Sequence, residues 1–132
     1  MAPQNDPGLT VDEMKQFVAR HFDDFVNRKK SEVALANFSA DFLDHDEPGE
    51  PQVGPEAAQT MMEAAYRRWP DLDVTIEEMI AEGDKVGVRN TWRATEAESG
   101  RRIEFHGFVS WRFAGGKIVE RWATITTPRE LS

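Results

Sequence analysis

The stretch that decides the fold covers residues 105–122 and reads FHGFVSWRFAGGKIVERW. On both sides of Gly115-Gly116, bulky apolar side chains alternate with small or polar ones, and a period of two is the pattern of a β-strand. A Gly-Gly pair between two such runs is typical of a tight hairpin turn, because glycine adopts positive φ angles without steric cost. The stretch therefore predicts a β-hairpin with strands over residues 103–113 and 118–126.

The predicted turn also sets a register in which Phe113 lies opposite Ile118. An uninterrupted ladder then pairs Trp111 with Glu120, Val109 with Trp122, and Phe108 with Ala123. One face of the hairpin would carry Phe105, Val109, Trp111, Phe113, Ile118 and Trp122. The other would carry His106, Phe108, Ser110, Arg112, Val119, Arg121, Ala123 and Ile125. Both faces are too apolar to be left to water. We therefore expect helices to cover one face and a second subunit to cover the other.

The expected dimer interface belongs to the face of the first set. It would be centred on Phe105, Val109, Trp111 and Trp122. Since a self-complementary patch can pair with its own copy, this arrangement predicts a homodimer.

Helical patterns precede the strands. Thr10 and Glu13 have the spacing of a capping box, and apolar residues then recur at helical spacing over residues 14–26. A short helix that includes Phe38 is expected after Ser31, and a third runs from Pro55 to Trp69. Two further long strands are expected over residues 72–76 and 86–92, and a short strand is expected near Phe42, over residues 41–46. This order predicts an α+β fold with a curved antiparallel sheet, made of a flexible lead-in (residues 1–9) and a single domain (residues 10–132).

Composition excludes several classes of function. The 132 residues include 16 Lys and Arg against 24 Asp and Glu, a net charge of −8, which argues against a nucleic-acid partner. Cysteine is absent, so disulfides and thiolate chemistry are excluded. No apolar run approaches the roughly 20 residues of a membrane helix, and the N-terminus lacks the apolar core of a signal peptide. We therefore expect a cytoplasmic protein with no membrane partner.

Five short segments carry a family resemblance: FLDHD (residues 42–46), WPDL (69–72), IAEGDKV (80–86), FHGF (105–108) and GGKIVERW (115–122). In this order and spacing, residues 38–126 resemble the SnoaL-like polyketide cyclases of the nuclear transport factor 2-like and ketosteroid-isomerase-like superfamily. The resemblance implies a cone-shaped α+β barrel, with the N-terminal helices packed in the curved sheet around a pocket. It also implies dimers that pair through the outer sheet surface.

The same resemblance implies a reaction. These cyclases close a ring by an intramolecular aldol reaction without a metal or cofactor, and an aspartate transfers the proton next to a carbonyl. In the family that aspartate directly follows the tryptophan of the last strand, but here Ala123 follows Trp122. Because a methyl group cannot move a proton, the fold transfers to this chain whereas the reaction does not transfer with it.

Other residues are therefore candidates for the chemistry. If position 123 faces the pocket, as the resemblance implies, the period of two also places Arg121, Phe108, Ser110 and His106 there. His106 can exchange a proton near neutral pH, and Arg121 can stabilise an enolate or bind a carboxylate. Alternatively, His106 is hydrogen-bonded at the mouth of the barrel and Arg121 is paired with a nearby acid.

The remaining candidates rest on similar reasoning. His45 matches a pocket histidine of many relatives, or else it fixes the loop that begins at Glu47. Trp69 and Phe22 complete the expected substrate-binding set with Phe108, Ser110 and Ala123. His21 lies on the apolar stripe of the first helix and is expected to be a core histidine. No pair of histidines has metal-ligand spacing, so no metal site is expected.

Two hypotheses of function remain open. In the first, the protein is an isomerase, lyase or cyclase that needs no cofactor, with His106, His45 and Arg121 as catalytic residues and a small apolar or ring-containing carbonyl compound as substrate. In the second, a protein of the same fold binds a small hydrophobic ligand or another protein and catalyses nothing. A buried pocket with two titratable groups within about 3–4 Å of each other would favour catalysis.

Overall fold

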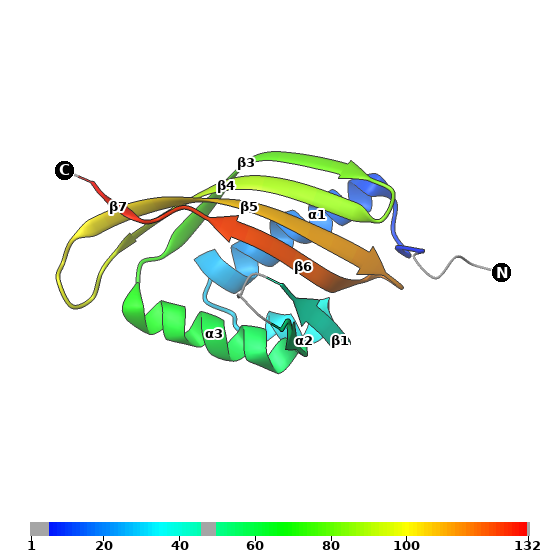
Figure 1. The fold of residues 1–132 in the computed structure, drawn as a ribbon, viewed down its shortest axis with the longest axis horizontal. Helices are drawn as coiled ribbons and strands as arrows, with labels where there is room; N and C mark the ends of the chain where they lie inside the picture. Colours follow the sequence, from blue (N-terminus) through cyan, green and yellow to red (C-terminus); the bar gives the residue numbers. More distant parts are fainter. Residues whose placement is uncertain (1–5, 46–49, 132) are drawn as a thin grey trace.

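The computed structural model describes residues 6–45 and 50–131, and its helices precede most of the strands (Figure 1). They are α1 (Val11–Phe22), a π-helical turn η1 (Asp23–Asn27) that continues it, α2 (Val33–Asn37) and α3 (Pro55–Arg68). The capping box is confirmed, because the Glu13 amide donates to Thr10 Oγ1 at 3.1 Å and the Thr10 amide to Glu13 Oε1 at 2.9 Å. None of the helices in the described residues is long and apolar enough to cross a membrane.

The described strands form one curved sheet in the order β2-β1-β6-β5-β4-β3, and β7 pairs with β5. Their bounds are β1 (Phe38–Asp44), β2 (Gln52–Val53), β3 (Asp73–Glu82), β4 (Lys85–Thr95), β5 (Arg102–Ala114), β6 (Lys117–Ile125) and β7 (Arg129–Glu130). The hairpin turn at Gly115-Gly116 is confirmed, with φ angles of 58° and 81°. The four long strands are therefore those that the alternation predicts.

The sheet is mixed, which corrects the prediction of a purely antiparallel one. β1 runs parallel to β6, with Phe38 opposite Ile118 and Asp44 opposite Arg121. Phe38, expected in the second helix, is the first residue of β1 and is buried. The described strands also do not close into a barrel, since β3 and β2 remain as edges. Alternation along one segment identifies a strand, but it carries no information about the segment with which that strand pairs.

A β-bulge in β6 overturns most of the predicted hairpin register. Phe113 lies opposite Ile118 as expected, but Arg112 lies opposite Glu120, so Val119 is an extra residue without a partner. Beyond this point every pairing is shifted by one, and Trp111 faces Arg121 while Val109 faces Ala123. Because a shift of one residue moves a side chain to the other face, Arg121 and Ala123 share a face with Trp111 and Val109, and Trp122 lies on the opposite face.

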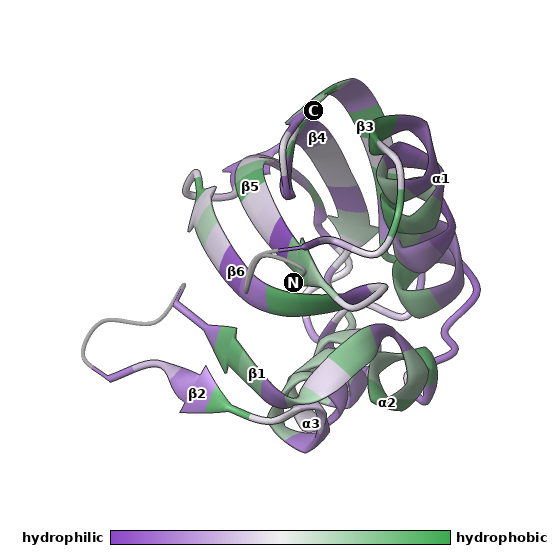
Figure 2. Cartoon of the chain, turned by 90° about the vertical axis from the view of Figure 1, so that its right-hand side faces the viewer, coloured by the Kyte–Doolittle hydropathy of each residue, from purple (hydrophilic) through white to green (hydrophobic). Residues whose placement is uncertain are grey.

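The helices cover the face that carries Trp111, as Figure 2 shows for the concave side of the sheet. Phe105, Val109 and Trp111 are buried there in the core of the chain, together with Phe22 and Val18 of α1. The prediction that these three strand residues form a dimer interface is therefore wrong. The outer face instead carries Phe108 and Trp122, which are 55% and 37% exposed.

The end of the predicted lead-in is attached to the hairpin turn. The amide of Gly115 donates to the Asp6 carbonyl at 3.0 Å, and the amide of Gly116 donates to the Pro7 carbonyl at 2.7 Å. Gly8 has a φ of 74°, and a Cβ atom there would lie 2.5 Å from the Gly116 nitrogen. The close approach of the two backbones therefore requires glycine at position 8.

We predict that Gly8→Ala destabilises the protein more than Gly100→Ala does. Both glycines have nearly the same positive φ, 74° and 73°, but no atom lies within 4 Å of a Cβ at Gly100. In each variant an alanine adopts a left-handed backbone conformation, which costs roughly 1–2 kcal/mol. Only Gly8→Ala also forces Asp6 and Pro7 away from the turn. Urea unfolding should show the difference, and amide exchange at Gly115 and Gly116 should accelerate only in Gly8→Ala. Equal behaviour of the two variants would contradict the attachment.

Candidate functional site

A cavity of about 210 Å³ lies on the concave side of the sheet, lined by residues of β1, β4, β5, β6, α1, η1 and α3. Its wall is mostly aromatic and aliphatic, and includes Phe22, Trp69, Trp92, Phe105 and Trp111. An engineered apolar cavity of about 150 Å³ is large enough to bind benzene, so this inner cavity has room for a substituted ring.

A buried ion pair joins two strands at the wall of the inner cavity. Asp44 ends β1 and Arg121 belongs to β6, and Asp44 Oδ1 lies 2.9 Å from Arg121 Nη1. The two side chains are only 8% and 17% exposed, and the guanidinium carbon lies 5.6 Å from the centre of the Trp111 ring. Since a buried charge is stable only with a partner, the parallel pairing of β1 with β6 is what allows both groups to lie here.

His21 contributes a neutral imidazole to the same cavity. It is fully buried, and burial lowers its pKa from 6.5 to about 3, with a further lowering by the positive charge of Arg121. Its Nδ1 atom lies 2.9 Å from Asn37 Nδ2. Among the described residues, His21 Nε2 and the indole nitrogens of Trp69 and Trp111 are buried without a hydrogen-bond partner. All three residues line the inner cavity, so unpaired polar nitrogens belong to the side chains of its wall.

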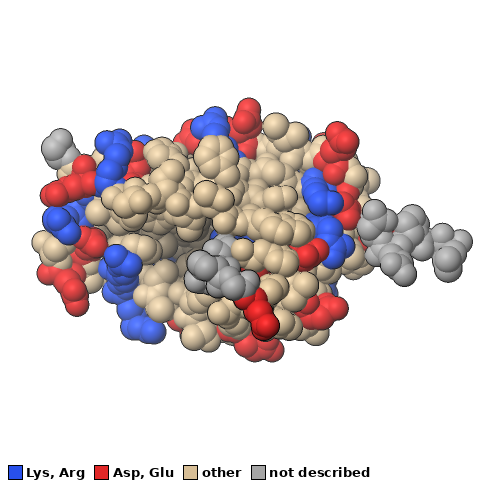
Figure 3. All heavy atoms as spheres, viewed as in Figure 1, with Lys and Arg blue, Asp and Glu red and all other residues tan. Residues whose placement is uncertain are grey.

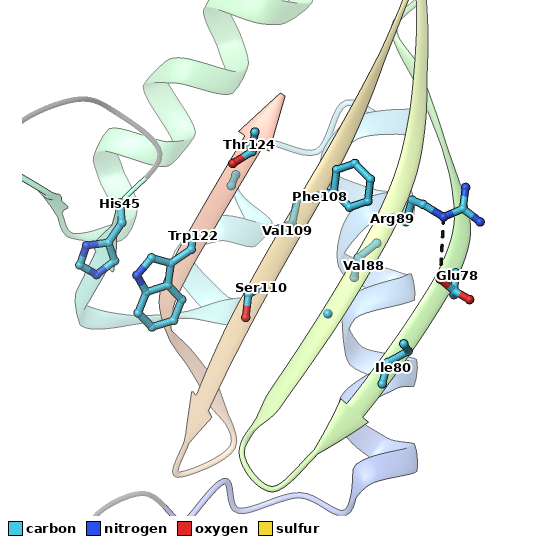
Figure 4. Close-up of a pocket in the computed structure, with 12 residues that line it drawn as sticks. His45, Glu78, Ile80, Val88, Arg89, Phe108, Val109, Ser110, Trp122 and Thr124 are labelled. Atoms are coloured by element: carbon cyan, nitrogen blue, oxygen red, sulfur yellow. Dashed lines mark ion pairs between the residues drawn. The ribbon is translucent and has the colours of Figure 1, made fainter. Parts of the chain in front are cut away.

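A second, wider hollow of about 540 Å³ lies on the outer face of the sheet (Figure 4). Trp122 and Ile80 border it on two sides, with Ser110 and Gly87 in the row between them, and Phe108 lies two residues from Ser110 along β5 (Figure 4). Here the sheet carries little side-chain bulk, since Gly87 has none and Ser110 has only a hydroxymethyl group. Arg89 and Glu78 also line the hollow, with Nε and Oε1 3.8 Å apart (Figure 4). In the space-filling view a large part of the surface carries no Lys, Arg, Asp or Glu (Figure 3).

His45 lies at the edge of the outer hollow. Its ring stacks on Trp122 with centroids 4.9 Å apart and an interplanar angle of 4°. His45 Nε2 lies 2.8 Å from Glu120 Oε2, and the other oxygen of that carboxylate accepts from Arg112 Nε. These contacts account for the position of the ring.

The structure divides the predicted site residues between the two faces. Arg121, Trp69 and Phe22 line the inner cavity. Ala123 shares a face with Arg121 and packs against the core, but it does not line the inner cavity and is among the residues around the outer hollow. His45, Phe108 and Ser110 line the outer hollow. His106 also lies on the outer side, half exposed, with Nε2 3.5 Å from Glu104 Oε1 and Nδ1 3.3 Å from Thr91 Oγ1. The sheet therefore separates both predicted proton-transfer histidines from Arg121, and their catalytic roles stay predictions.

Sequence reasoning did not identify Asp44 as a site residue, although it lies within the FLDHD segment. One signal was present, because Phe42 and Asp44 are two residues apart in a strand and therefore share a face. Phe42 is fully buried, so an acidic side chain on the same face needs a buried partner. The partner itself could not be predicted without the parallel pairing and the bulge.

Comparisons with known structures agree with this architecture. AclR, a proposed hydroxylase from Streptomyces galilaeus, superposes with a TM-score of 0.79 at 27% identity, covering 89% of this chain and 77% of that one. A proposed polyketide cyclase from Bacillus cereus gives 0.74 at 26% identity, covering 94% and 85%. A proposed SnoaL-like polyketide cyclase from Jannaschia gives 0.78 at 18% identity, covering 95% and 89%, which shows the fold alone.

The chain has an α+β fold in which the curved sheet and the helices surround a small apolar cavity with an ion pair in its wall. The model of the SnoaL-like polyketide cyclases matches residues 16–126 of the chain. The chain therefore belongs to the SnoaL-like polyketide cyclase family, as the short segments of the sequence indicate. Comparison with curated proteins gave no match.

We predict that His21 makes the stability of the protein depend on pH. The unfolded chain takes up a proton at His21 near pH 6.5, whereas the folded chain does so only near pH 3. The folded state is therefore penalised as the pH falls below 6.5, and about 2 kcal/mol of unfolding free energy should be lost between pH 7.5 and pH 5.

Urea unfolding at the two pH values tests this, with His21→Gln as the comparison. Glutamine has a similar size and does not titrate, so the variant should lack most of this pH dependence. Measurement stops at pH 5 because carboxyl groups, with reference pKa values near 4, begin to take up protons below it. An equal loss of stability in both proteins would contradict the buried, neutral state of His21.

Proposed function

We propose that the protein catalyses proton transfer next to the carbonyl group of a small ring-containing molecule bound in the inner cavity. Asp44 is the acid–base residue, and Arg121 stabilises the charge that develops. The observation that carries the proposal is the 2.9 Å contact between their side chains in the wall of an otherwise apolar cavity. Two ionisable groups at this distance in a buried pocket favour catalysis over simple binding.

The chemistry needs only these two groups. The Asp44 carboxylate takes a proton from the carbon next to the carbonyl, the C–H electron pair forms the C=C bond of an enolate, and the carbonyl π pair moves onto oxygen. The guanidinium stabilises that oxygen, in surroundings where little water weakens the attraction. In a ring closure the enolate carbon attacks a second carbonyl of the same molecule, and the proton passes from Asp44 to the new alkoxide. In an isomerisation the proton returns to a different carbon.

Asp44 supplies the carboxylate that Ala123 lacks. The family resemblance implies a carboxylate at position 123, on the inner face of β6 and two residues beyond Arg121. In this chain the carboxylate next to Arg121 comes from β1, whose Asp44 is the register partner of Arg121. The proposal therefore keeps the proton transfer of the first sequence hypothesis and assigns it to Asp44 rather than to His106 or His45.

We predict that Asp44→Asn abolishes proton exchange on a simple ketone. The probe is 2-tetralone, a bicyclic ketone with activated C–H bonds, and the measurement is deuterium incorporation in D₂O followed by NMR, above the rate in buffer alone. Loss of the proton-transfer group should lower the rate about 100- to 10,000-fold. Asp41→Asn is the matched control, because Asp41 lies in the same strand, is exposed, and contacts Ser39 rather than the cavity.

Two results would count against the proposal. A folded Asp44→Asn protein that exchanges at the wild-type rate would exclude Asp44 as the acid–base residue. A wild-type protein that binds 2-tetralone but exchanges it no faster than buffer would favour the alternative, a non-catalytic binding protein of the same fold.

We further propose that the outer face forms a homodimer, with an interface different from the one expected from the sequence. Phe108, Trp122 and Ile80 are exposed around the outer hollow, and Ile80 is 66% exposed. Burying these apolar side chains against a second copy removes them from water, which is favourable. The space above Gly87 and Ser110 can receive a bulky side chain of that copy. The large surface area without Lys, Arg, Asp or Glu supports a contact of that kind (Figure 3).

We predict a mass near twice the chain mass of 15.0 kDa in light scattering at micromolar concentration. Ile80→Glu should weaken the dimer, because it places a charge in the interface close to Glu78. The matched control is Leu35→Glu, since Leu35 of α2 is 48% exposed and lies outside the hollow. A monomeric wild-type protein, or equal masses for both variants, would contradict the proposed interface.

A further inference from the structure

His21 lies at the end of α1, where Nδ1 of its ring contacts Asn37 and Nε2 has no hydrogen-bond partner among the described residues. The ring stacks on Phe25 with centroids 4.8 Å apart, and Phe38 and Trp111 lie at 4.9 and 5.5 Å. These aromatic contacts fix the plane of the imidazole at the wall of the inner cavity. A histidine that served only to fill the core would be replaceable by an apolar ring, which has no nitrogen to satisfy.

The contact with Asn37 sets the position of the proton on the ring. Asn37 Nδ2 lies 2.9 Å from His21 Nδ1, and an amide nitrogen can only donate. Nδ1 must therefore be the accepting nitrogen, and the proton of the neutral ring is on Nε2. Burial and the nearby charge of Arg121 keep the ring neutral, since they lower its pKa to about 3. The Nε2–H group is thus a fixed donor that does not change with pH in the physiological range.

This donor has no partner among the residues that the structure describes, and it is not alone. The indole N–H groups of Trp69 and Trp111, which line the same cavity, are also buried and unpartnered. Buried polar groups are normally hydrogen-bonded, because an unpaired one has lost its water without compensation. Three such donors belong to residues around one apolar cavity, and the Arg121 guanidinium is a further donor in its wall. A ligand with hydrogen-bond acceptors would satisfy them.

We propose that His21 is a specificity-determining residue that donates a hydrogen bond from Nε2 to an oxygen of the ligand. This inference deepens the proposed function, since it concerns the ligand of the same cavity. His21 transfers no proton in this role. It binds a carbonyl oxygen, and its N–H remains a donor when that oxygen becomes an enolate.

The test compares two probes and two nearly isosteric variants. Tetralin and 2-tetralone have the same ring system and differ by one carbonyl oxygen. Wild-type protein should bind 2-tetralone more tightly than tetralin, by about 5- to 10-fold for one net hydrogen bond. His21→Met removes the donor and should lose most of this preference, with little change in tetralin affinity. His21→Gln keeps both an acceptor for Asn37 and a donor for the ligand, so it should retain the preference.

A measurement on the wild-type protein keeps the proposal testable even if a variant does not fold. With ¹⁵N-labelled histidine, NMR should show the His21 proton on Nε2 at every pH from 5 to 8, and a shift of the Nε2 resonance when 2-tetralone is added. Three results would overturn the proposal. They are a wild-type protein without a preference for 2-tetralone, a His21→Met variant that keeps the preference, and an Nε2 resonance that does not shift when the ketone is added. Because binding is measured at equilibrium, a failure of Asp44 to transfer protons would leave this comparison unaffected.

Discussion

The β-bulge at Val119 is the constraint on which the rest of the site depends. It adds one residue to β6 directly after the hairpin turn, so that Arg121 and Ala123 face the concave side while Trp122 faces outward. Without it, the arginine would lie on the outer surface and the indole would compete for space inside the core. A single inserted residue thus determines which charge enters the cavity and which aromatic ring is left for the outer face.

The position of Arg121 in turn determines the position of Asp44. A guanidinium that is mostly withdrawn from water needs a carboxylate, and the parallel strand β1 brings one into register. Buried ion pairs are often no more stabilising than apolar residues of the same size, and removing one partner costs about 3–5 kcal/mol. The small net stability expected of such a pair is consistent with the role toward a ligand that we propose for Asp44 and Arg121. His21, neutral because of burial and of Arg121, belongs to the same electrostatic arrangement.

Much of the fold could be predicted from the sequence, because local patterns determine it. The Thr10–Glu13 capping box, the helix that starts at Pro55 and the Gly115-Gly116 hairpin all follow from residues that are close in the chain. The site could not be predicted in the same way. The family resemblance implies that position 123 faces the pocket, and an uninterrupted ladder places Phe108 and His106 on the same face as position 123. In the structure Ala123 shares its face with Arg121, whereas Phe108 and His106 lie on the other face. Neither the extra residue at Val119 nor the parallel partner of β1 leaves a signal in the local pattern, and Asp44 depends on both.

The most direct measurement of the central claim is the location of a bound ring compound. The four tryptophans report on different places, since Trp69, Trp92 and Trp111 line the inner cavity and Trp122 borders the outer hollow. In a sample saturated with 2-tetralone, intermolecular NOEs should connect the ligand to the indole protons of Trp69 and Trp111, and Trp122 should show none. NOEs to Trp122 and Phe108, with none to Trp69 or Trp111, would contradict the assignment of the inner cavity as the functional site.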